Sequence, residues 1–358
     1  MGKARIIMNN LGQTFETDEL RDQYYSRIVG YIREHGFDVE TVNGREGDEE
    51  LTISQLKGAD AVIFSSNGPV TEKVLTACPQ LKLVIRYGVG LNSVDLPACT
   101  RHGVVVINEP GYCRNELALH ALALGMAALR NLYLYDSNIR KGVWLKGNGP
   151  LPIEPFNMTM GIVGLGAAGR VLAKILMGAF GAPVIAYDPY CRPEDAAALG
   201  VELVSKEELC RRAQWINITA PLTPETRHLI SWDEFKLMSP KTIITNISRG
   251  PIIDNEALLD ALKTHKIYGA GIDVFEHEPV KADSEFCRLD NIIMSPHNAY
   301  YGVEALENID FLISRMMVRF FDDKVIYRRH LCNPDIEPQL EGFTIRDCEP
   351  EEDTAYDD

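Results

Sequence analysis

Long apolar runs, paired cysteines and an excess of basic charge are all missing from this 358-residue sequence. The longest apolar run, 117–129, is too short to cross a bilayer and contains His120. The first residues lack the apolar core of a secretory signal. None of the eight cysteines forms a C-x-x-C pair or a zinc-type cluster with histidine. We therefore predict a cytoplasmic protein with reduced thiols, no metal site and no membrane partner.

Acidic residues exceed basic ones: the sequence has 51 aspartates and glutamates but 36 lysines and arginines, which gives a formal net charge of −15. This balance argues against a nucleic-acid backbone as the main partner. Part of the acidic surplus lies in 343–358, where we predict an acidic disordered tail. The length and the ordinary apolar share predict two globular domains.

A G-x-G-x-x-G motif is formed by Gly164, Gly166 and Gly169, directly after the apolar run 158–163. A helical pattern and a second apolar run, 183–187, follow it. In dinucleotide-binding folds the first glycine permits a tight turn, the second lets the pyrophosphate approach the backbone, and the third lets the helix pack on the sheet. Strand, glycines, helix and strand together predict such a site.

The cofactor is predicted to be NAD. The Ala167 and Ala168 amides begin the helix after the glycines, where unpaired N–H groups and the helix dipole favour a phosphate. Asp188 ends the second apolar run, about 20 residues beyond the glycines, where a carboxylate binds the ribose hydroxyls. The same carboxylate would repel the 2′-phosphate of NADP.

Short apolar strands alternate with helical patterns, which is typical of α/β proteins whose parallel sheets carry helices on both faces. Strands are predicted at 5–8, 37–42, 61–64, 81–87, 104–107, 158–163, 183–187, 216–218, 242–246, 269–274 and 292–294. Long helices are predicted at 116–131 and 303–321, and Asp18 is suited to cap the first helix. The glycine- and proline-rich stretch 133–157 is predicted to be an irregular arm.

Polar residues gather where three predicted strands of the second half end: Arg249, Asp273, Glu278 and His297. Parallel strands bring their carboxyl ends to one sheet edge, where ligands bind. Arginine holds a carboxylate bidentately, histidine exchanges protons near neutrality, and a carboxylate beside it favours the imidazolium. These groups meet the needs of 2-oxo acid reduction.

Three stretches follow the glycine motif in order: NISRGPIID at 246–254, GAGIDVFEHEP at 269–279 and SPHNA at 295–299. Together they resemble the D-isomer-specific 2-hydroxyacid dehydrogenases, a family that includes phosphoglycerate, glycerate and D-lactate dehydrogenases. The resemblance covers about residues 60–320. It implies an NAD-dependent oxidoreductase that interconverts a 2-oxo acid and a D-2-hydroxy acid.

The resemblance also implies roles for single residues. Arg249 would bind the substrate, His297 would donate the proton, and Glu278 would be the acid paired with that histidine. Asp273 matches the acid near the nicotinamide carboxamide of the cofactor. The family's substrate-carboxylate loop matches Gly88, Val89 and Gly90.

The family implies an α/β fold of two Rossmann-like, doubly wound parallel-sheet domains with a cleft between them. Its flavodoxin-like substrate domain would correspond to 1–105 plus 298–330, and its NAD-binding Rossmann domain to 106–297. A homodimer built on the cofactor domains is typical of the family. The expected small-molecule partners are 2-oxo and 2-hydroxy acids.

Several alternatives stay open. Ser65 and Asn67 stand in a stretch where phosphoglycerate enzymes carry an arginine, which argues against a phosphorylated substrate without identifying another. Tyr300 and Tyr301 also resemble the C-terminal-binding-protein branch, whose members act as NADH-binding corepressors. The alternative is therefore an NAD(H)-sensing interaction protein with weak catalysis. His120, on the apolar helix, is interpreted as a satisfied core histidine.

Overall fold

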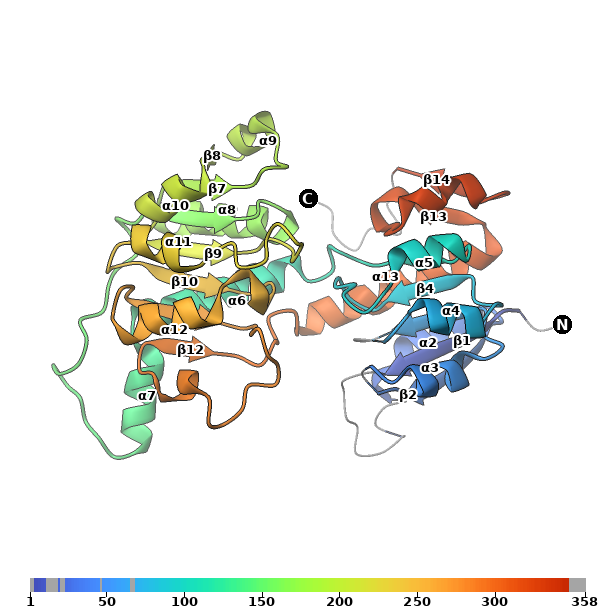
Figure 1. The fold of residues 1–358 in the computed structure, drawn as a ribbon, viewed down its shortest axis with the longest axis horizontal. Helices are drawn as coiled ribbons and strands as arrows, with labels where there is room; N and C mark the ends of the chain where they lie inside the picture. Colours follow the sequence, from blue (N-terminus) through green and yellow to red (C-terminus); the bar gives the residue numbers. More distant parts are fainter. Residues whose placement is uncertain (1–2, 11–18, 20–22, 46, 65–67, 348–358) are drawn as a thin grey trace. The chain divides into compact units, whose positions relative to one another are not determined.

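The computed structural model describes residues 3–10, 19, 23–45, 47–64 and 68–347 (Figure 1). The expectations for Asp18, Ser65, Asn67 and 348–358 lie outside these residues. The chain divides into two compact units, Met1–Tyr112 with Val303–Asp358, and Cys113–Gly302. It therefore crosses from one unit to the other twice.

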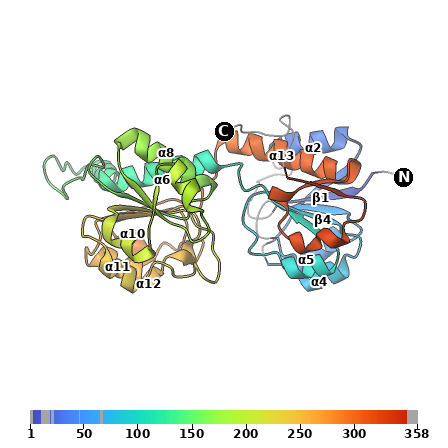
Figure 2. The same cartoon turned by 90° about the horizontal axis from the view of Figure 1, so that it is seen from above.

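The first unit is built on a parallel five-stranded sheet whose strands are rich in buried aliphatic residues. Its strands are β1 (Arg5–Asn10), β2 (Asp38–Asn43), β3 (Ala61–Phe64), β4 (Leu83–Arg86) and β5 (Val105–Ile107). Their order, β2-β1-β3-β4-β5, is the flavodoxin-like one. One face carries α2 (Ser26–Glu34) and α13 (Val303–Asp322), and the other carries α4 (Glu72–Ala77) and α5 (Leu96–Arg101) (Figure 2). Helix α3 (Glu49–Leu56) packs beside α4.

The second unit contains a parallel seven-stranded sheet in the order β12-β11-β10-β9-β6-β7-β8. Its strands are β6 (Met160–Val163), β7 (Val184–Tyr187), β8 (Glu202–Leu203), β9 (Trp215–Ile218), β10 (Ile243–Asn246), β11 (Gly269–Ile272) and β12 (Ile292–Met294). Helices α6 (Arg114–Leu129) and α8 (Ala167–Phe180) lie on one face (Figure 2). Helices α10 (Lys206–Arg212), α11 (Trp232–Leu237) and α12 (Asn255–Lys263) lie on the other. The sheet order reverses between β9 and β6, as in dinucleotide-binding folds.

Both sheets confirm the predicted class, α/β with two doubly wound parallel sheets, because helices bury each sheet on both faces. Close packing of α6 on the second sheet depends on two glycines. A Cβ on Gly125 would stand 1.9 Å from Trp215, and one on Gly271 would stand 2.7 Å from Leu124 Cβ. Within the described residues no single helix is long and apolar enough to span a membrane. Only α6 and the next helix, α7 (Leu132–Arg140), pass by length and composition when taken together, and they are bent by 68° at the break between them.

The predicted irregular arm is wrong at its beginning, because residues of that stretch form helix α7 (Leu132–Arg140). Asn131 separates α7 from α6, because its left-handed conformation, with φ of 53°, interrupts the helix. Helix α7 has no buried residue, and its apolar residues Leu132, Tyr135 and Ile139, although at helical spacing, stay exposed or half-buried. In Figure 1, α7 and the following segment lie outside the layers of the second unit.

The predicted disordered tail is also wrong in its first residues, since β14 (Thr344–Arg346) pairs in parallel with β13 (Val325–Tyr327). Arg328 Nε donates to Asp347 Oδ1 at 2.9 Å beside this pair. Long-range pairing therefore orders a segment whose composition alone indicates a solvated chain. The remaining elements are α9 (Pro193–Ala198) and the 3-10 helices Gly250–Ile252, Glu285–Arg288, Arg328–His330 and Pro334–Gln339.

Candidate functional site

The three motif glycines lie between β6 and α8 and differ in what surrounds them. Gly164 has φ of +95°, and a Cβ there would stand 2.6 Å from the Ala220 backbone. A Cβ on Gly169 would stand 2.3 Å from Gly164 O. Gly166, in contrast, is exposed, and a Cβ there would meet nothing within 4 Å. Two glycines thus serve the packing of the protein, and the third leaves open space above the backbone, as a pyrophosphate requires.

Helix α8 begins at Ala167, directly after Gly166, which as its N-cap offers no side chain to the first-turn N–H groups. Ala167 is exposed and Ala168 is half-buried. An uncapped helix start with small side chains presents backbone donors and the positive end of the helix dipole to an anion. The site therefore fits the pyrophosphate of a dinucleotide.

Asp188, at the end of β7, is tied to the same turn. Its carboxylate accepts hydrogen bonds from the N–H groups of Leu165 at 2.7 Å, Tyr190 at 2.9 Å and Cys191 at 3.1 Å. These three bonds fix the half-buried carboxylate beside the glycines. Since a carboxylate offers about four acceptor positions, there is capacity for a further donor such as a ribose hydroxyl.

Asp273 directly follows β11 and is buried. Its side chain is hydrogen-bonded to the loop that follows β12. Its carboxylate accepts from Ser295 Oγ at 2.5 Å and from the N–H groups of Asn298 at 3.0 Å and Ala299 at 2.9 Å. His120 Nε2, from α6, lies 2.8 Å from Ser295 Oγ. Burial acts to raise the pKa of Asp273, but hydrogen bonds from His120, Ser295 and the two amides lower it below the usual 3.8. An ionised Asp273 thus holds this loop in place.

His297 and Glu278 form a hydrogen-bonded pair, with His297 Nδ1 2.8 Å from Glu278 Oε2. His297 has φ of +56°, a left-handed conformation that L side chains rarely adopt, and its N–H donates to Asp273 O at 2.8 Å. Burial acts to raise the pKa of Glu278, but hydrogen bonds from His297 and the Phe275 N–H lower it below 4.5. Uncommon backbone geometry of this kind often marks a functional position.

Arg249 follows β10 in a loop shaped by short-range hydrogen bonds. Asn246 Nδ2 donates to Arg249 O at 3.0 Å, and the Arg249 N–H donates to Ser248 Oγ at 2.6 Å. A Cβ on the next residue, Gly250, would stand 1.9 Å from the carbonyl carbon of Phe275. The segment that carries Arg249 therefore packs directly on the segment that leads to Glu278.

These residues share one sheet edge. The glycine turn follows β6, Arg249 follows β10, Asp273 follows β11, and His297 follows β12, and all four strands run parallel. The structure thus places the cofactor motif and the predicted acid–base pair at the carboxyl edge of one sheet, where open α/β sheets bind ligands.

The predicted substrate loop, Gly88, Val89 and Gly90, follows β4 and belongs to the first unit. Gly88 has φ of +136°, which favours glycine. Arg86 Nε donates to Gly90 O at 2.9 Å, and Asn108 Nδ2 donates to Val89 O at 2.8 Å. The carbonyl groups of this loop are therefore tied back to the protein.

Sequence reasoning missed three contributors to these arrangements: Ser295, His120 and Arg86. A signal existed for two of them. His120 is a polar residue within an apolar helix, and Arg86 is a charge that ends an apolar strand beside a glycine loop. Interpreting His120 as a satisfied core histidine overlooked its link through Ser295 to Asp273.

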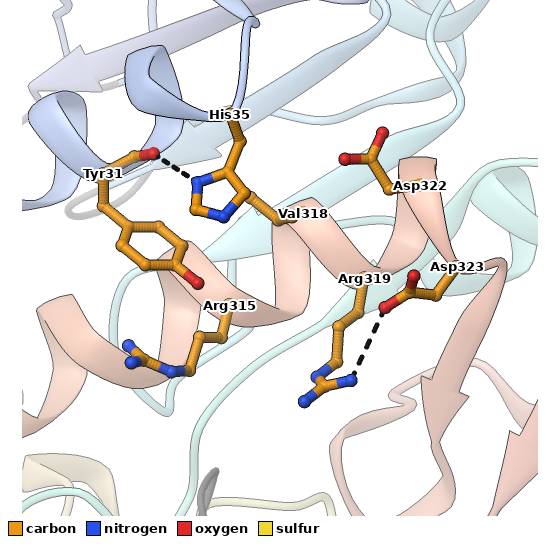
Figure 3. A pocket seen from close by; sticks show the side chains of 7 residues that line it. All are labelled: Tyr31, His35, Arg315, Val318, Arg319, Asp322 and Asp323. Atoms are coloured by element: carbon orange, nitrogen blue, oxygen red, sulfur yellow. Dashed lines mark hydrogen bonds and ion pairs between the residues drawn. The ribbon is translucent and has the colours of Figure 1, made fainter.

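A pocket of about 410 Å³ opens between α2 and α13 of the first unit (Figure 3). It is lined by Tyr31, His35, Arg315, Val318, Arg319, Asp322 and Asp323. None of these residues is among those predicted to bind substrate or cofactor. In Figure 3, Arg319 faces Asp323, and His35 Nδ1 lies 2.8 Å from Tyr31 O. With charges of both signs, the lining selects no class of ligand.

Known proteins resemble this chain along most of its length. The D-3-phosphoglycerate dehydrogenase of Methanocaldococcus jannaschii is 38% identical over 289 residues, which are 79% of this chain and 53% of that protein. The glyoxylate reductase of Thermococcus litoralis is 34% identical over 292 residues, 80% of this chain and 87% of that protein. The crystal structure of D-lactate dehydrogenase from Aquifex aeolicus, complexed with NAD and lactic acid, matches with a TM-score of 0.75 and 25% identity, covering 88% of this chain and 95% of that one.

The chain spans about half the length of the phosphoglycerate dehydrogenases it matches. Residues 122–299 match the model described as the D-isomer specific 2-hydroxyacid dehydrogenase, NAD binding domain. This segment contains the glycine turn, Asp188, Arg249, Asp273, Glu278 and His297. With that match and the coverage of the glyoxylate reductase, the resemblance inferred from the sequence is confirmed: the chain belongs to the D-isomer specific 2-hydroxyacid dehydrogenase family.

Proposed function

We propose that the protein is an NAD-dependent dehydrogenase that interconverts a 2-oxo acid and a D-2-hydroxy acid. The observation that carries the proposal is the hydrogen bond of 2.8 Å between His297 Nδ1 and Glu278 Oε2, on the sheet edge that also holds the glycine turn. A proton donor and a dinucleotide site on one edge are the parts that carbonyl reduction requires.

His297 is the proposed acid–base residue. Because Nδ1 is engaged by Glu278, Nε2 is the nitrogen that would give a proton to the carbonyl oxygen in reduction and take it back in oxidation. The negative charge of Glu278 stabilises the imidazolium and orients the ring. Arg249 would bind the substrate carboxylate. Gly88, Val89 and Gly90, in the first unit, are the proposed substrate loop, whose backbone N–H groups are suited to donate to an anion.

The cofactor would be held by the glycine turn. NADH, when bound, supplies the hydride. Gly166 leaves room for the pyrophosphate, the Ala167 and Ala168 amides donate to it, and Asp188 accepts from the ribose. Asp273 would act on the nicotinamide side by fixing Ser295 and the loop that carries His297. We propose NAD over NADP because the Asp188 charge would repel a 2′-phosphate.

The test is turnover of a panel of 2-oxo acids with NADH and with NADPH. The panel contains glyoxylate, hydroxypyruvate, its 3-phosphate, pyruvate and branched 2-oxo acids, because the relatives carry names of both phosphorylated and small substrates. We expect reduction of at least one acid with NADH and a higher kcat/KM than with NADPH. The variant Asp188→Ser should weaken NADH binding and reduce the preference.

Arg249→Ala should raise the KM for the oxo acid and also lower kcat, whereas Arg211→Ala, an exposed arginine in α10, should change neither. The relatives described above carry enzyme names, so we do not propose the interaction-protein alternative. Absence of turnover with every acid of the panel would bring that alternative back.

We also propose a homodimer. The segment from α7 to β6 presents exposed apolar side chains, among them Trp144, 76% exposed, and Leu151, 86% exposed. Its backbone is held to the second unit, because Asn131 Nδ2 donates to Pro150 O at 3.2 Å and Tyr268 Oη donates to Leu151 O at 2.9 Å. A fixed segment with outward apolar side chains is suited to bury them against a second copy.

A further inference from the structure

A buried hydrogen bond joins the start of the proposed substrate loop to helix α13. Tyr87 Oη donates to Asp310 Oδ1 at 2.7 Å across 223 positions of sequence. Each residue is 8% exposed. Tyr87 directly precedes Gly88, and Asp310 lies in the first half of α13. The bond therefore connects loop and helix within the first unit.

Burying this acid is unfavourable. Burial raises the pKa of Asp310 from 3.8 to about 6, although the hydrogen bond from Tyr87 and the nearby charge of Arg27 act to lower it. Asp310 is buried on α13 together with apolar residues of the same helix, including Ile309 and Ile313. An apolar residue at 310 would therefore serve packing better than a carboxylate does. We therefore explain the presence of a carboxylate at 310 by its hydrogen bond to Tyr87, which holds the residue before Gly88 in place.

The bond holds the entry of the loop. Gly88 has φ of +136°, and as a glycine it imposes no conformation of its own on the backbone. Arg86 Nε holds the far end at Gly90 O, and Asn108 holds the middle at Val89 O. The phenol of Tyr87 anchors the near end, packed edge-on against the Tyr25 ring with centroids 6.1 Å apart. The backbone here is also held, since Arg86 Nη1 donates to Tyr87 O at 2.6 Å, but the bond from the Glu109 N–H to Gly88 O is long, at 3.4 Å. The phenol is therefore the side-chain anchor that supports a weakly held glycine.

We propose that Asp310, through its hydrogen bond to Tyr87, is a positioning residue that fixes Gly88, Val89 and Gly90 in the conformation that binds the substrate carboxylate. The inference rests on the proposed function, because that function gives the loop an anionic substrate. It goes further by assigning substrate affinity to a residue of α13, a helix with no predicted site residue.

The decisive variant is the double substitution Tyr87→Phe with Asp310→Leu. It removes donor and acceptor together, so no buried polar group is left unpaired and the protein should fold. We expect the KM for the preferred oxo acid to rise about tenfold, the scale of one lost hydrogen bond to a charged group. The Kd for NADH should stay close to wild type, because the dinucleotide site lies in the other unit, and the melting temperature should not fall, since the variant removes a buried acid. Asp310→Asn keeps an oxygen acceptor for Tyr87 and should retain most of the wild-type affinity.

Thr52→Val is the matched control, since Thr52 is 1% exposed and donates its hydroxyl to Asp48 O within the first unit. It should leave the KM unchanged. A wild-type KM in the double variant would overturn the proposal, and so would an equal rise of KM in Thr52→Val.

Hydrogen exchange at the Gly88, Val89 and Gly90 amides separates this inference from the proposed function. The double variant should exchange faster there than wild type, and Asp310→Asn should not. If wild type reduced no oxo acid but the loop still exchanged faster in the double variant, the function would fail and the positioning would stand. Unchanged exchange would overturn the positioning whatever the enzyme activity.

Discussion

At the scale of single residues, the proposed acid–base pair of His297 and Glu278 is held in place by backbone hydrogen bonds on both sides. His297 is fixed by its own backbone, which is bonded to Asp273 O, while Glu278 is fixed by the Phe275 N–H. Because hydrogen bonds keep the pKa of Glu278 below 4.5, this carboxylate stays charged over the working range of most assays. The pair thus keeps a negative group beside the proposed proton donor above about pH 4.5.

The first prediction concerns this pair. Reduction needs a protonated His297 and oxidation a neutral one, so the two directions should lose activity at opposite ends of the pH range. Glu278→Gln removes the charge but keeps the shape, and its reduction activity should fall off at lower pH than that of wild type, with NADH binding intact. His297→Ala should lower kcat by about 10²–10⁴. Wild-type turnover in His297→Ala would refute the proton-donor role.

The second prediction concerns the stability that Asp310 controls. Its pKa is raised to about 6 from an unfolded value of 3.8, so the stability it contributes is complete below pH 3.8 and is lost as the pH rises through 6. The groups that act on it are Tyr87, Arg27 and, with like charge, Glu307. Asp310→Asn cannot ionise. Between pH 4 and pH 8, wild type should therefore lose about 2.5 kcal/mol of unfolding free energy relative to this variant. Urea unfolding of both proteins across this range is the measurement, and parallel curves would contradict it.

At the scale of elements, the turn between β6 and α8 separates packing from binding within one motif. Gly164 and Gly169 are required by neighbouring backbone, whereas Gly166 faces open space. The same residue type therefore serves two different physical purposes within six consecutive residues, and substitution distinguishes them.

The third prediction uses this contrast. Gly166→Val should fold normally, because its φ of −77° suits any residue, yet it should weaken NADH binding by at least about tenfold through the loss of close approach. Gly169→Val should instead lower the melting temperature, since its side chain would collide with Gly164 O and cost about 1–3 kcal/mol or more. Calorimetric titration with NADH and thermal unfolding separate the two. Equal effects of both variants on the melting temperature would show that Gly166 also serves packing.

At the scale of the whole molecule, the segment from α7 to β6 belongs to no layer of the second unit and exposes large apolar side chains. Such a surface on an isolated chain favours association. The rest of the described surface is rich in ion pairs between exposed side chains, which contribute little to association.

The fourth prediction tests the proposed dimer. Trp144→Asp combined with Leu151→Asp places charges on the apolar segment and should yield a monomer in sedimentation velocity, while wild type sediments as a dimer. Tyr190→Asp, which charges another exposed aromatic residue, is the matched control and should remain a dimer. A monomeric wild type would refute the homodimer, and a dimeric double variant would move the interface elsewhere.

Many strands, the glycine turn and the sheet topology could be predicted from the sequence because their signals are local. Apolar runs such as 61–64 predict buried parallel strands, and 61–64 matches β3 residue for residue. Glycine spacing predicts the turn after β6, where backbone clashes admit no Cβ at Gly164 or Gly169. The alternation of strand and helix then restricts the topology, because parallel connections are right-handed and short.

Only the tertiary structure decided what depends on segments far apart in the chain. Helix α7 has no buried residue, and β14 is ordered by its pairing with β13 rather than by its own composition. Periodicity and turn chemistry act over a few residues, so they cannot report which distant groups meet. Tyr87 and Asp310 are 223 positions apart in the sequence, and only the path of α13 places this buried acid against the start of the proposed substrate loop.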